Sequence, residues 1–321
     1  MNKKSKIYVA GHTGLVGSAL IRQLQKDHYS NIVVTSFEQL DLRNQGSVLD
    51  FFAQEKPEYV FLAAAKVGGI MANVESPADF LYDNVMITAN VLHAAYLFSV
   101  KKLLFFGSSC IYPRACAQPI KEEYLLSGFL EPTNEPYAIA KIMGLTAVKA
   151  YRKQYEAPFI ACMPTNLYGP GDNFDLFSSH VLPALIAKFD HAQKNDHDHI
   201  VLWGTGKPLR EFLFVDDLAA AALFLMHNYD EAEHINIGTG YDISIAQLAE
   251  YIKEIMQFKG TILFDTTKPD GTPRKLLNVD RLSQLGWHAQ TSLVDGIKKT
   301  VDWYLQQNNS YKSVRINEAL L

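Results

Sequence analysis

Short apolar runs alternate with longer segments of mixed polarity through the first half of the chain. Each apolar run is bounded by glycine, proline or polar residues, which is typical of buried strands. The runs that predict strands are 6–10, 31–35, 58–62, 102–107 and 159–163. The segments that predict helices are 18–26, 77–98 and 137–155. Because strands and helices alternate, we predict an α/β fold with a doubly wound parallel sheet of the Rossmann type.

The alternation changes past residue 170. The segments that predict helices there are 180–189, 244–256 and 292–306, and those that predict strands are 201–206 and 210–215. Asp216 and Asp217 are predicted to cap the next helix. Residues 265–275, rich in charge, proline and glycine, predict a mobile loop, and the residues from Asn308 look like a tail.

Two domains are therefore expected. Residues 1–170 are predicted to form a dinucleotide-binding Rossmann domain, and residues 171–321 a smaller α/β substrate-binding domain. Segments around 211–237 are candidates for packing back on the first domain.

Composition and charge exclude some classes of function. Hydrophobic residues make up 48% and charged residues 20%, as in globular proteins, and the net charge of -4 does not favour nucleic acid or anionic membranes as partners. No apolar run reaches the ~18 residues of a membrane span, and no signal peptide is visible. Cys110, Cys116 and Cys162 form no disulfide or metal framework, so we expect a reducing cytoplasm. The polar run 194–199 is interpreted as a solvated loop rather than a metal site.

A glycine turn joins the first predicted strand to the first predicted helix. Gly11, Gly14 and Gly17 follow the spacing Gly-x-x-Gly-x-x-Gly. Glycines let backbone N–H groups approach a diphosphate at a helix N-terminus, where the helix dipole favours anions. The turn therefore predicts a dinucleotide site.

Other residues suited to this site follow the later strands. Asp41 and Leu42 lie beyond the second strand, where an adenine would rest, and the small residues Ala63 and Ala64 end the third strand. In parallel sheets ligands bind at the carboxyl ends of the strands. We therefore expect these loops to converge on one crevice.

Tyr137 and Lys141 stand four residues apart after Pro136, at the start of a long predicted helix. Residues at this spacing share a helix face. An ammonium group beside a phenol lowers the phenol pKa, so this pair is predicted to act as acid or base near neutrality. Ser108 or Ser109, at the end of the fourth strand, can hydrogen-bond a carbonyl that becomes an alkoxide. The Ser–Tyr–Lys set suits hydride transfer at a carbonyl carbon.

With these motifs the chain resembles the extended short-chain dehydrogenases/reductases that act on nucleotide sugars. The matching runs are 11–17, 63–70, 107–113, 137–141, 166–170, 179–181, 203–212 and 268–275. The resemblance implies conversion of GDP-4-keto-6-deoxy-D-mannose to GDP-L-fucose with NADP(H). The implied steps are epimerisation at carbons 3 and 5, followed by hydride reduction at carbon 4.

The resemblance also implies roles for individual residues. The reductase set matches Ser108, Tyr137 and Lys141, and the epimerase acid–base pair matches Cys110 and His180. The substrate-contacting positions match Lys188, Trp203, Arg210 and Asp270. The positions along the cofactor match Gly11, His12, Thr13, Gly14, Leu15, Val16, Gly17, Phe37, Asp41, Leu42, Ala63, Ala64, Phe106, Gly107, Ser108, Ser109, Tyr137, Lys141, Pro164, Thr165, Asn166, Leu167 and His180. It further implies a homodimer formed through helices 77–98 and 137–155.

The chemistry of Cys110 and His180 suits their implied role. A ketone at carbon 4 acidifies the hydrogens at carbons 3 and 5. Inverting both centres needs one group that removes a proton and another that returns it from the opposite face. A thiol with a free pKa of about 8.5 and an imidazole with one near 6.5 are both within reach of this task. Nucleotide-sugar dehydratases carry a carboxylate close after the serine or threonine, whereas this chain has Ser-Ser-Cys.

Two points stay open in the sequence. Thr13, Ser36 and Phe37 occupy places where an arginine or lysine would serve the 2′-phosphate of NADP, so the residues leave NAD open while the resemblance favours NADPH. The alternative functions are a 4-epimerase or 4-reductase acting on another nucleotide sugar, or a catalytically silent dinucleotide-binding sensor.

Overall fold

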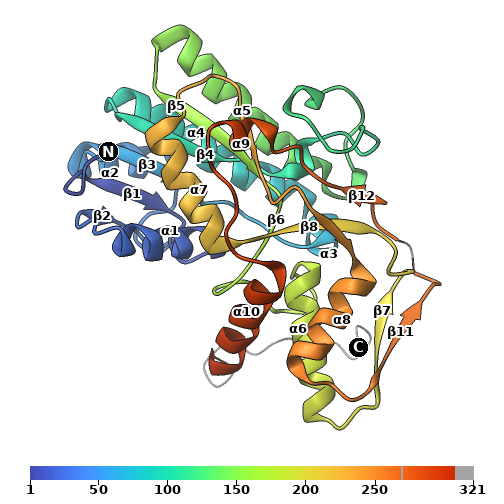
Figure 1. Cartoon of the computed structure of the whole chain (residues 1–321). Coiled ribbons are helices and arrows are strands. Elements are labelled where there is room, and N and C mark those ends of the chain that lie inside the picture. The colour runs from blue at the N-terminus through green and yellow to red at the C-terminus, as the bar shows by residue number, and fades with distance from the viewer. Residues whose placement is uncertain (269, 308–321) are drawn as a thin grey trace.

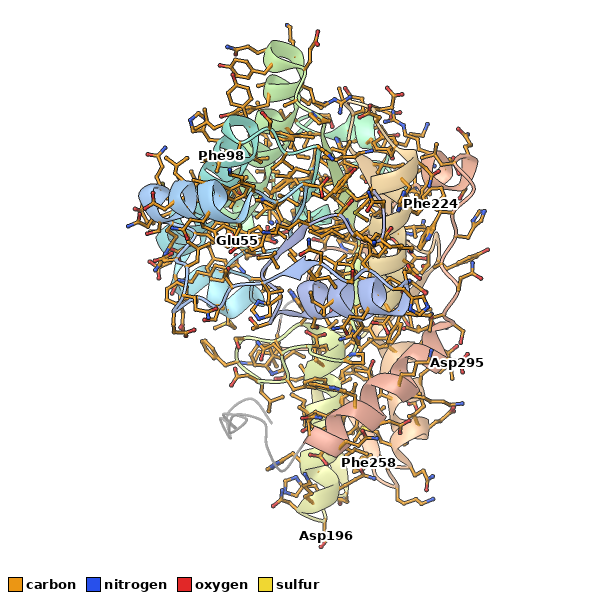
Figure 2. The ribbon with its side chains drawn as sticks, turned by 90° about the vertical axis from the view of Figure 1, so that its left-hand side faces the viewer. Glu55, Phe98, Asp196, Phe224, Phe258 and Asp295 are labelled. Carbon is orange, nitrogen blue, oxygen red and sulfur yellow. The ribbon has the colours of Figure 1, made fainter. Side chains whose placement is uncertain are left out.

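The computed structural model describes residues 1–268 and 270–307 (Figure 1). One part is a parallel six-stranded sheet with helices on both faces, and the other is a smaller group of helices and short strands. In the side view of Figure 2, Phe98 and Glu55 mark the first part, and Phe258 and Asp196 mark the second. The predicted α/β class is confirmed.

The main sheet carries the crevice in which a ligand is expected. Its strands are β1 (Ile7–Ala10), β2 (Ile32–Val33), β3 (Tyr59–Leu62), β4 (Lys102–Phe106), β5 (Phe159–Pro164) and β9 (Ile235–Ile237). They are ordered β2-β1-β3-β4-β5-β9, and all pairs are parallel. The chain reverses its direction across the sheet between β2 and β3, so β1 and β3 form the switch point where such folds bind ligands.

Helices cover both faces of this sheet. On one face lie α1 (Leu15–Lys26) and α7 (Val215–Asn228), and on the other lie α2 (Gln45–Glu55), α4 (Pro77–Leu97) and α5 (Glu135–Tyr155). The first face buries Leu20 and Leu218 completely, and the second buries Phe52 and Val91. Burial of each such side chain stabilises the fold by about 1.5–3 kcal/mol, which holds the loops at the strand ends in place.

The second part packs helices against small sheets. Its helices are α6 (Val181–Lys194), α8 (Ile245–Met256) and α10 (Leu293–Gln307). Its strands are β6 (Asn166–Tyr168), β7 (His199–Trp203), β8 (Leu209–Phe214), β10 (Asp242–Ser244), β11 (Thr261–Asp265) and β12 (Arg274–Lys275). Strand β8 is central, because it pairs with β6, β10 and β12. Phe189, Leu248 and Ile297 form the core of this part.

Short helices complete the connections. They are α3 (Ile70–Glu75), α9 (Asp280–Gln284) and the 3-10 turns Ser109–Ile111, Glu122–Tyr124 and Pro132–Asn134. None of the helices in the described ranges is both long and apolar enough to cross a membrane.

The structure corrects two local predictions. Arg274 and Lys275, expected in a mobile loop, form β12, which pairs with β8 in parallel. Asp216 and Asp217 do not cap α7, because its N-cap is Phe214 and no side chain bonds there. Instead Asp217 accepts a hydrogen bond from the backbone N–H of Thr291 (2.8 Å) and so ties α7 to the segment before α10. The tail predicted from Asn308 lies outside the described residues.

Candidate active site

The glycine turn has the shape that a dinucleotide diphosphate requires. Gly11 has a φ of +85°, and a Cβ there would lie 2.7 Å from the backbone of Ala64. A Cβ on Gly17 would lie 2.0 Å from the carbonyl oxygen of Gly11. Gly14 is the N-cap of α1 and offers no side-chain hydrogen bond, so the first N–H groups of the helix are available to an anion. These residues fit a dinucleotide.

A cation that the sequence analysis missed lies near the expected adenosine end. The guanidinium of Arg43 lies 5.2 Å from the ring centroid of Phe37, which is 62% exposed. Arg43 also pairs with Asp41 (2.8 Å) and Asp83 (3.0 Å). The charge of Arg43 is therefore compensated by two carboxylates, which weakens its attraction for a 2′-phosphate. The contact of Arg43 with Phe37 depends on how the loop after β2 folds, which sequence spacing does not reveal.

The residues after β3 and β5 are held close to the same strand ends. Ala63 donates its backbone N–H to the carbonyl oxygen of Ala10 at the end of β1 (3.1 Å). Thr165 and Asn166 follow β5, and the Asn166 amide donates to the carbonyl oxygen of Glu211 (2.8 Å). This bond holds the segment that follows β5 against β8, with which Asn166 also pairs as part of β6.

The predicted reductase residues meet at the end of β4. The Ser108 hydroxyl lies near the Tyr137 side chain, and its Oγ accepts the N–H of Cys110 (3.4 Å). Lys141 is buried, and its Nζ donates to the carbonyl oxygen of Phe106 at 2.8 Å. The structure therefore brings together the hydroxyl, phenol and ammonium groups that the sequence predicted.

The expected lowering of the Tyr137 pKa does not occur in this arrangement. Burial raises the pKa of Tyr137, with the nearby Cys110 adding to the shift and the Ser108 hydroxyl opposing it. Burial lowers the pKa of Lys141 to about 8. The physical reason is that Lys141 directs its ammonium to Phe106, while loss of solvent disfavours every charged form here. Tyr137 is therefore protonated at neutral pH and able to donate a proton.

The predicted epimerase residues come from separate elements. Cys110 is buried in the turn after β4, and His180 is the N-cap of α6. Burial raises the pKa of Cys110, opposed by the positive charge of Lys275. Desolvation lowers the pKa of His180, and Lys275 lowers it further. The thiol is therefore protonated and the imidazole neutral at neutral pH.

Two of the predicted substrate residues lie on α6 and β7. Lys188 follows His180 by two helical turns and therefore shares its face. Its ammonium donates to the carbonyl oxygen of Val201 (3.0 Å), and burial lowers its pKa to about 8. Trp203 is 44% exposed, and the ammonium of Lys268 lies 5.4 Å from its ring centroid. These contacts tie Lys188 to β7 rather than to the reductase residues.

The other two predicted substrate residues lie on β8 and on the loop before β12. Asp270 accepts hydrogen bonds from the backbone N–H (2.8 Å) and hydroxyl (2.7 Å) of Thr205, which lower its pKa. Burial lowers the pKa of Arg210, and the charge of Asp270 opposes the shift. Arg210 donates to the carbonyl oxygen of Leu209 (2.8 Å). The loop is thus fixed beside β8 by Asp270.

Two further residues of this region were not predicted. Glu211 is fully buried and accepts the N–H groups of Thr239 (2.7 Å), Gly240 (2.8 Å) and Leu277 (3.0 Å). Lys275 lies opposite Arg210 in the pairing of β12 with β8. The available signal was a glutamate within a mostly apolar predicted strand, but the partners of Glu211 are distant in sequence.

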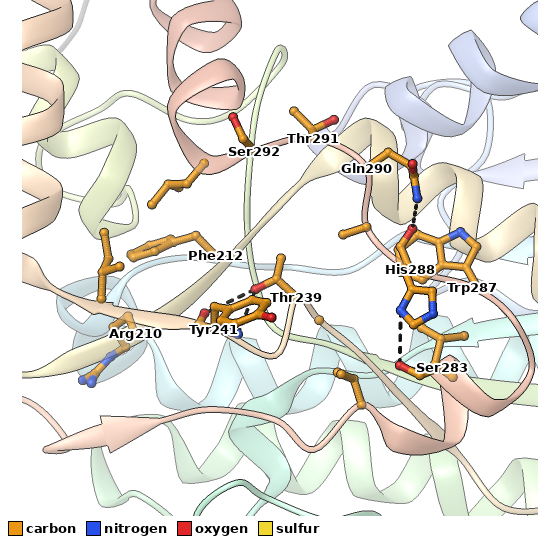
Figure 3. A pocket seen from close by; sticks show the side chains of 16 residues that line it. Arg210, Phe212, Thr239, Tyr241, Ser283, Trp287, His288, Gln290, Thr291 and Ser292 are labelled. Atoms are coloured by element: carbon orange, nitrogen blue, oxygen red, sulfur yellow. Dashed lines mark hydrogen bonds between the residues drawn. The ribbon is translucent and has the colours of Figure 1, made fainter.

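A cavity of about 520 Å³ lies between β8 and the segment that precedes α10 (Figure 3). Arg210 is at its edge, and Phe212, Tyr241, Trp287 and His288 line it. Of the predicted site residues, only Arg210 is among its lining residues. Across residues 1–268 and 270–307, no group of three or more His, Cys, Asp or Glu side chains is placed to hold a metal ion.

Comparisons with known proteins show the family of the chain. Residues 7–238 match the "NAD dependent epimerase/dehydratase family". The GDP-L-fucose synthase 1 of Arabidopsis thaliana is 55% identical over 305 residues, which cover 95% of this chain and 94% of that protein.

Solved structures of nucleotide-sugar enzymes are also similar to this chain. The GDP-L-fucose synthetase of Naegleria fowleri bound to NADP has a TM-score of 0.91 at 34% identity, covering 97% of this chain and 95% of that one. The GDP-mannoheptose C4 reductase MlghC of Campylobacter jejuni with NADP bound has a TM-score of 0.88 at 41% identity, covering 95% of this chain and 99% of that one. Because the family match spans more than half of the chain and these relatives align nearly end to end, the chain belongs to the NAD dependent epimerase/dehydratase family.

Proposed function

We propose that this chain converts GDP-4-keto-6-deoxy-D-mannose to GDP-L-fucose, the activity named for its relative in Arabidopsis thaliana. The observation that carries the proposal is the grouping of Ser108 with both Tyr137 and Cys110. A single hydroxyl lies near the phenol expected to serve reduction and accepts the backbone N–H of the cysteine expected to serve epimerisation. One sugar ring placed over Ser108 would be within reach of both chemistries.

Epimerisation comes first in this mechanism. The neutral imidazole of His180 takes a proton from carbon 3 or carbon 5, and the resulting enolate oxygen is stabilised by the hydroxyl of Ser108. The thiol of Cys110 then gives its proton to the same carbon from the opposite face. The directions of the two pKa shifts support this division, because they leave the base neutral and the acid protonated.

Reduction follows at carbon 4. When bound, the nicotinamide supplies the hydride. Tyr137 gives its proton to the oxygen at carbon 4, and Ser108 keeps that oxygen hydrogen-bonded. Lys141 holds the end of β4 in place through Phe106 and adds a positive charge near the developing alkoxide. Burial of Lys141 and Tyr137 strengthens these electrostatic contacts by excluding water.

The remaining roles belong to the same proposal. Lys188 and Arg210 carry the positive charge that the diphosphate of a GDP-sugar needs, Trp203 offers an exposed ring, and Asp270 fixes the loop next to Arg210. The glycine turn and the strand ends after β2, β3, β4 and β5 hold the dinucleotide. Residues 1–170 then serve the cofactor and residues from 171 onward serve the sugar, with α7 and β9 packed on the first part.

NADP(H) is the proposed cofactor, since solved relatives were found bound to NADP. A cytoplasmic location and a homodimer complete the proposal. The support for the dimer is that α4 and α5 pack side by side and expose apolar side chains at Leu81, Tyr82 and Ile139. Two copies that join these helices would cover this surface.

The test is incubation with GDP-4-keto-6-deoxy-D-mannose and either NADPH or NADH. Loss of nicotinamide absorbance and formation of GDP-L-fucose, identified by NMR, are expected. Formation of a 4-reduced sugar without inversion at carbons 3 and 5 would instead favour a C4 reductase, the activity named for MlghC. Turnover of a UDP-linked 4-keto sugar alone would favour an enzyme for another nucleotide sugar, and dinucleotide binding without turnover would favour a sensor.

A further inference from the structure

Lys275 lies in a strand that is fixed on both sides. Its neighbour Arg274 pairs with Asp242 (2.6 Å), and the next residue, Leu276, donates its N–H to the side chain of Gln118 (2.8 Å). Leu277 donates its N–H to the buried carboxylate of Glu211 (3.0 Å). The backbone of Lys275 therefore has little freedom, and its side chain is directed by the fold.

The same contacts bring Lys275 near the turn that carries Cys110. Ile120 donates its N–H to the carbonyl oxygen of Leu276 (2.7 Å), and Asn278 donates its N–H to the carbonyl oxygen of Ile120 (2.8 Å). Residues 118–120 thus join the segment after Cys110 to the segment around Lys275. On the other side, Lys275 pairs in register with Arg210 of β8.

The charged and titratable groups that face Lys275 come from several elements. Cys110, Arg210, Glu131 and Cys116 all act on its ammonium, and Lys275 in turn acts on His180. Glu131 is committed to Arg114, whose Nε lies 3.3 Å from its carboxylate.

Within residues 1–268 and 270–307, the ammonium of Lys275 makes no hydrogen bond or ion pair, in contrast to the ammonium groups of Lys141 and Lys188. A positive charge in an enclosed place is costly unless a negative charge compensates it. Glu131 is shared with Arg114, so the further negative charge that this site can offer Lys275 is the one that forms on Cys110 during the reaction.

We propose that Lys275 is a positioning residue for epimerisation, whose ammonium stabilises the thiolate that Cys110 becomes after it gives up its proton. This inference rests on the proposed function. In the balanced step, the imidazole of His180 takes the proton from the sugar carbon and the Cys110 thiol gives its own proton to that carbon. An imidazolium and a thiolate remain, and a proton passes back to sulfur to reset the pair. Lys275 also disfavours the imidazolium, which speeds the return of that proton.

The first measurement is exchange of the sugar hydrogens at carbons 3 and 5 in D₂O without dinucleotide. Lys275→Met is expected to slow exchange roughly 10-fold to 100-fold, and Lys275→Arg to restore much of it. Oxidation of GDP-L-fucose by NADP⁺, which reports the hydride step, is expected to change little. The matched control is Arg274→Met, which removes a positive charge from the same strand on its opposite face.

The second measurement follows alkylation of Cys110 by iodoacetamide across pH, resolved by peptide mass spectrometry. Lys275→Met is expected to raise the thiol pKa by roughly one unit, whereas Lys275→Arg and Arg274→Met leave it near the wild-type value. A wild-type pKa and wild-type exchange in Lys275→Met would overturn the inference. Equal losses in Lys275→Met and Arg274→Met would overturn it too, because strand packing would then explain both. Absence of exchange in the wild type would overturn the proposed function, while the alkylation series would still decide the role of Lys275.

Discussion

The ammonium of Lys141 donates a hydrogen bond to the carbonyl oxygen of Phe106 at 2.8 Å, so α5 is fastened to the end of β4. Ser108 stands two residues beyond this carbonyl and lies near the side chain of Tyr137 on α5. The contact between α5 and the end of β4 therefore fixes Tyr137 and Lys141 on the helix relative to Ser108 after the strand. Changes at Lys141 are expected to disturb position as well as charge.

Tyr137→Phe is expected to abolish reduction while leaving epimerisation nearly intact. The variant keeps the ring that packs edge-on against Phe80 but lacks the proton that the alkoxide needs. We expect NADPH oxidation to fall by about 10²-fold to 10⁴-fold. Exchange of sugar hydrogens in D₂O is the internal control, and its loss together with reduction would contradict separate roles for Tyr137 and Cys110.

Cys110→Ser is expected to block epimerisation, because a serine hydroxyl is a much weaker acid than a thiol. Exchange in D₂O should fall by roughly 10²-fold or more, and NADPH-dependent turnover of the keto sugar should fall with it. Cys116→Ser, at the half-buried thiol six residues further on, is the matched control and should behave like the wild type. Full turnover in Cys110→Ser would show that the thiol is not the proton donor.

Asp172 is expected to make the protein less stable as pH rises. Burial raises its pKa to about 7, and its Oδ2 has no hydrogen-bond partner among the described residues. Between the free value near 3.9 and this higher value, the folded state binds more protons than the unfolded state, so the free energy of unfolding falls with increasing pH. At higher pH the loss reaches at most about 4 kcal/mol.

Urea unfolding across this pH range tests that expectation. Asp172→Asn should lose the pH dependence that Asp172 contributes and become more stable than the wild type above pH ~7. Asp50→Asn, at an exposed position on α2, should leave the profile unchanged. A wild-type profile in Asp172→Asn would mean that this carboxyl ionises normally in the folded chain.

Thr13→Arg is expected to strengthen the preference for NADPH. Thr13 is exposed in the glycine turn, and Arg43 is occupied by Asp41 and Asp83. A new charge-assisted hydrogen bond to the 2′-phosphate should raise kcat/KM for NADPH about tenfold or more and leave that for NADH nearly unchanged. Thr13→Gln is the control for size, and equal gains with both dinucleotides would contradict a 2′-phosphate contact.

Ala89→Arg is expected to separate the proposed dimer into monomers. Ala89 is exposed midway along α4, so a long charged side chain there would interrupt close packing of the helices of two copies. Sedimentation velocity of the variant and the wild type measures the change. Ala53→Arg, at an exposed position on α2, should sediment like the wild type, and a monomeric wild type would refute the dimer.

The architecture could be predicted from the sequence because apolar runs and helix signals depend on residues close together in the chain. The strands β1, β3, β4 and β5 and the long helices α4 and α5 lie where the pattern placed them, within a few residues. The spacing of Tyr137 and Lys141 also indicated that these two residues would lie near Ser108. The short strand β9 escaped notice because three buried residues give too little periodicity to recognise.

The missed site residues share one physical cause. The roles of these residues, Glu211, Arg43 and Lys275, depend on contacts with residues far away in the chain. An example is the hydrogen bond that the N–H of Leu277 donates to Glu211. The pKa of Tyr137 was predicted in the wrong direction for a related reason. Helical spacing places Lys141 nearby, but burial and the Phe106 carbonyl determine where its charge acts.

Strand β9 returns from the distal half of the chain to close the outer edge of the six-stranded sheet against β5. A fragment that stopped near residue 170 would leave the backbone N–H and C=O groups of β5 unpaired and able to pair with another chain. Such a fragment should self-associate rather than survive as a free nucleotide-binding module. If the sugar-binding half were exchanged during evolution, the new half would therefore have to supply a strand equivalent to β9.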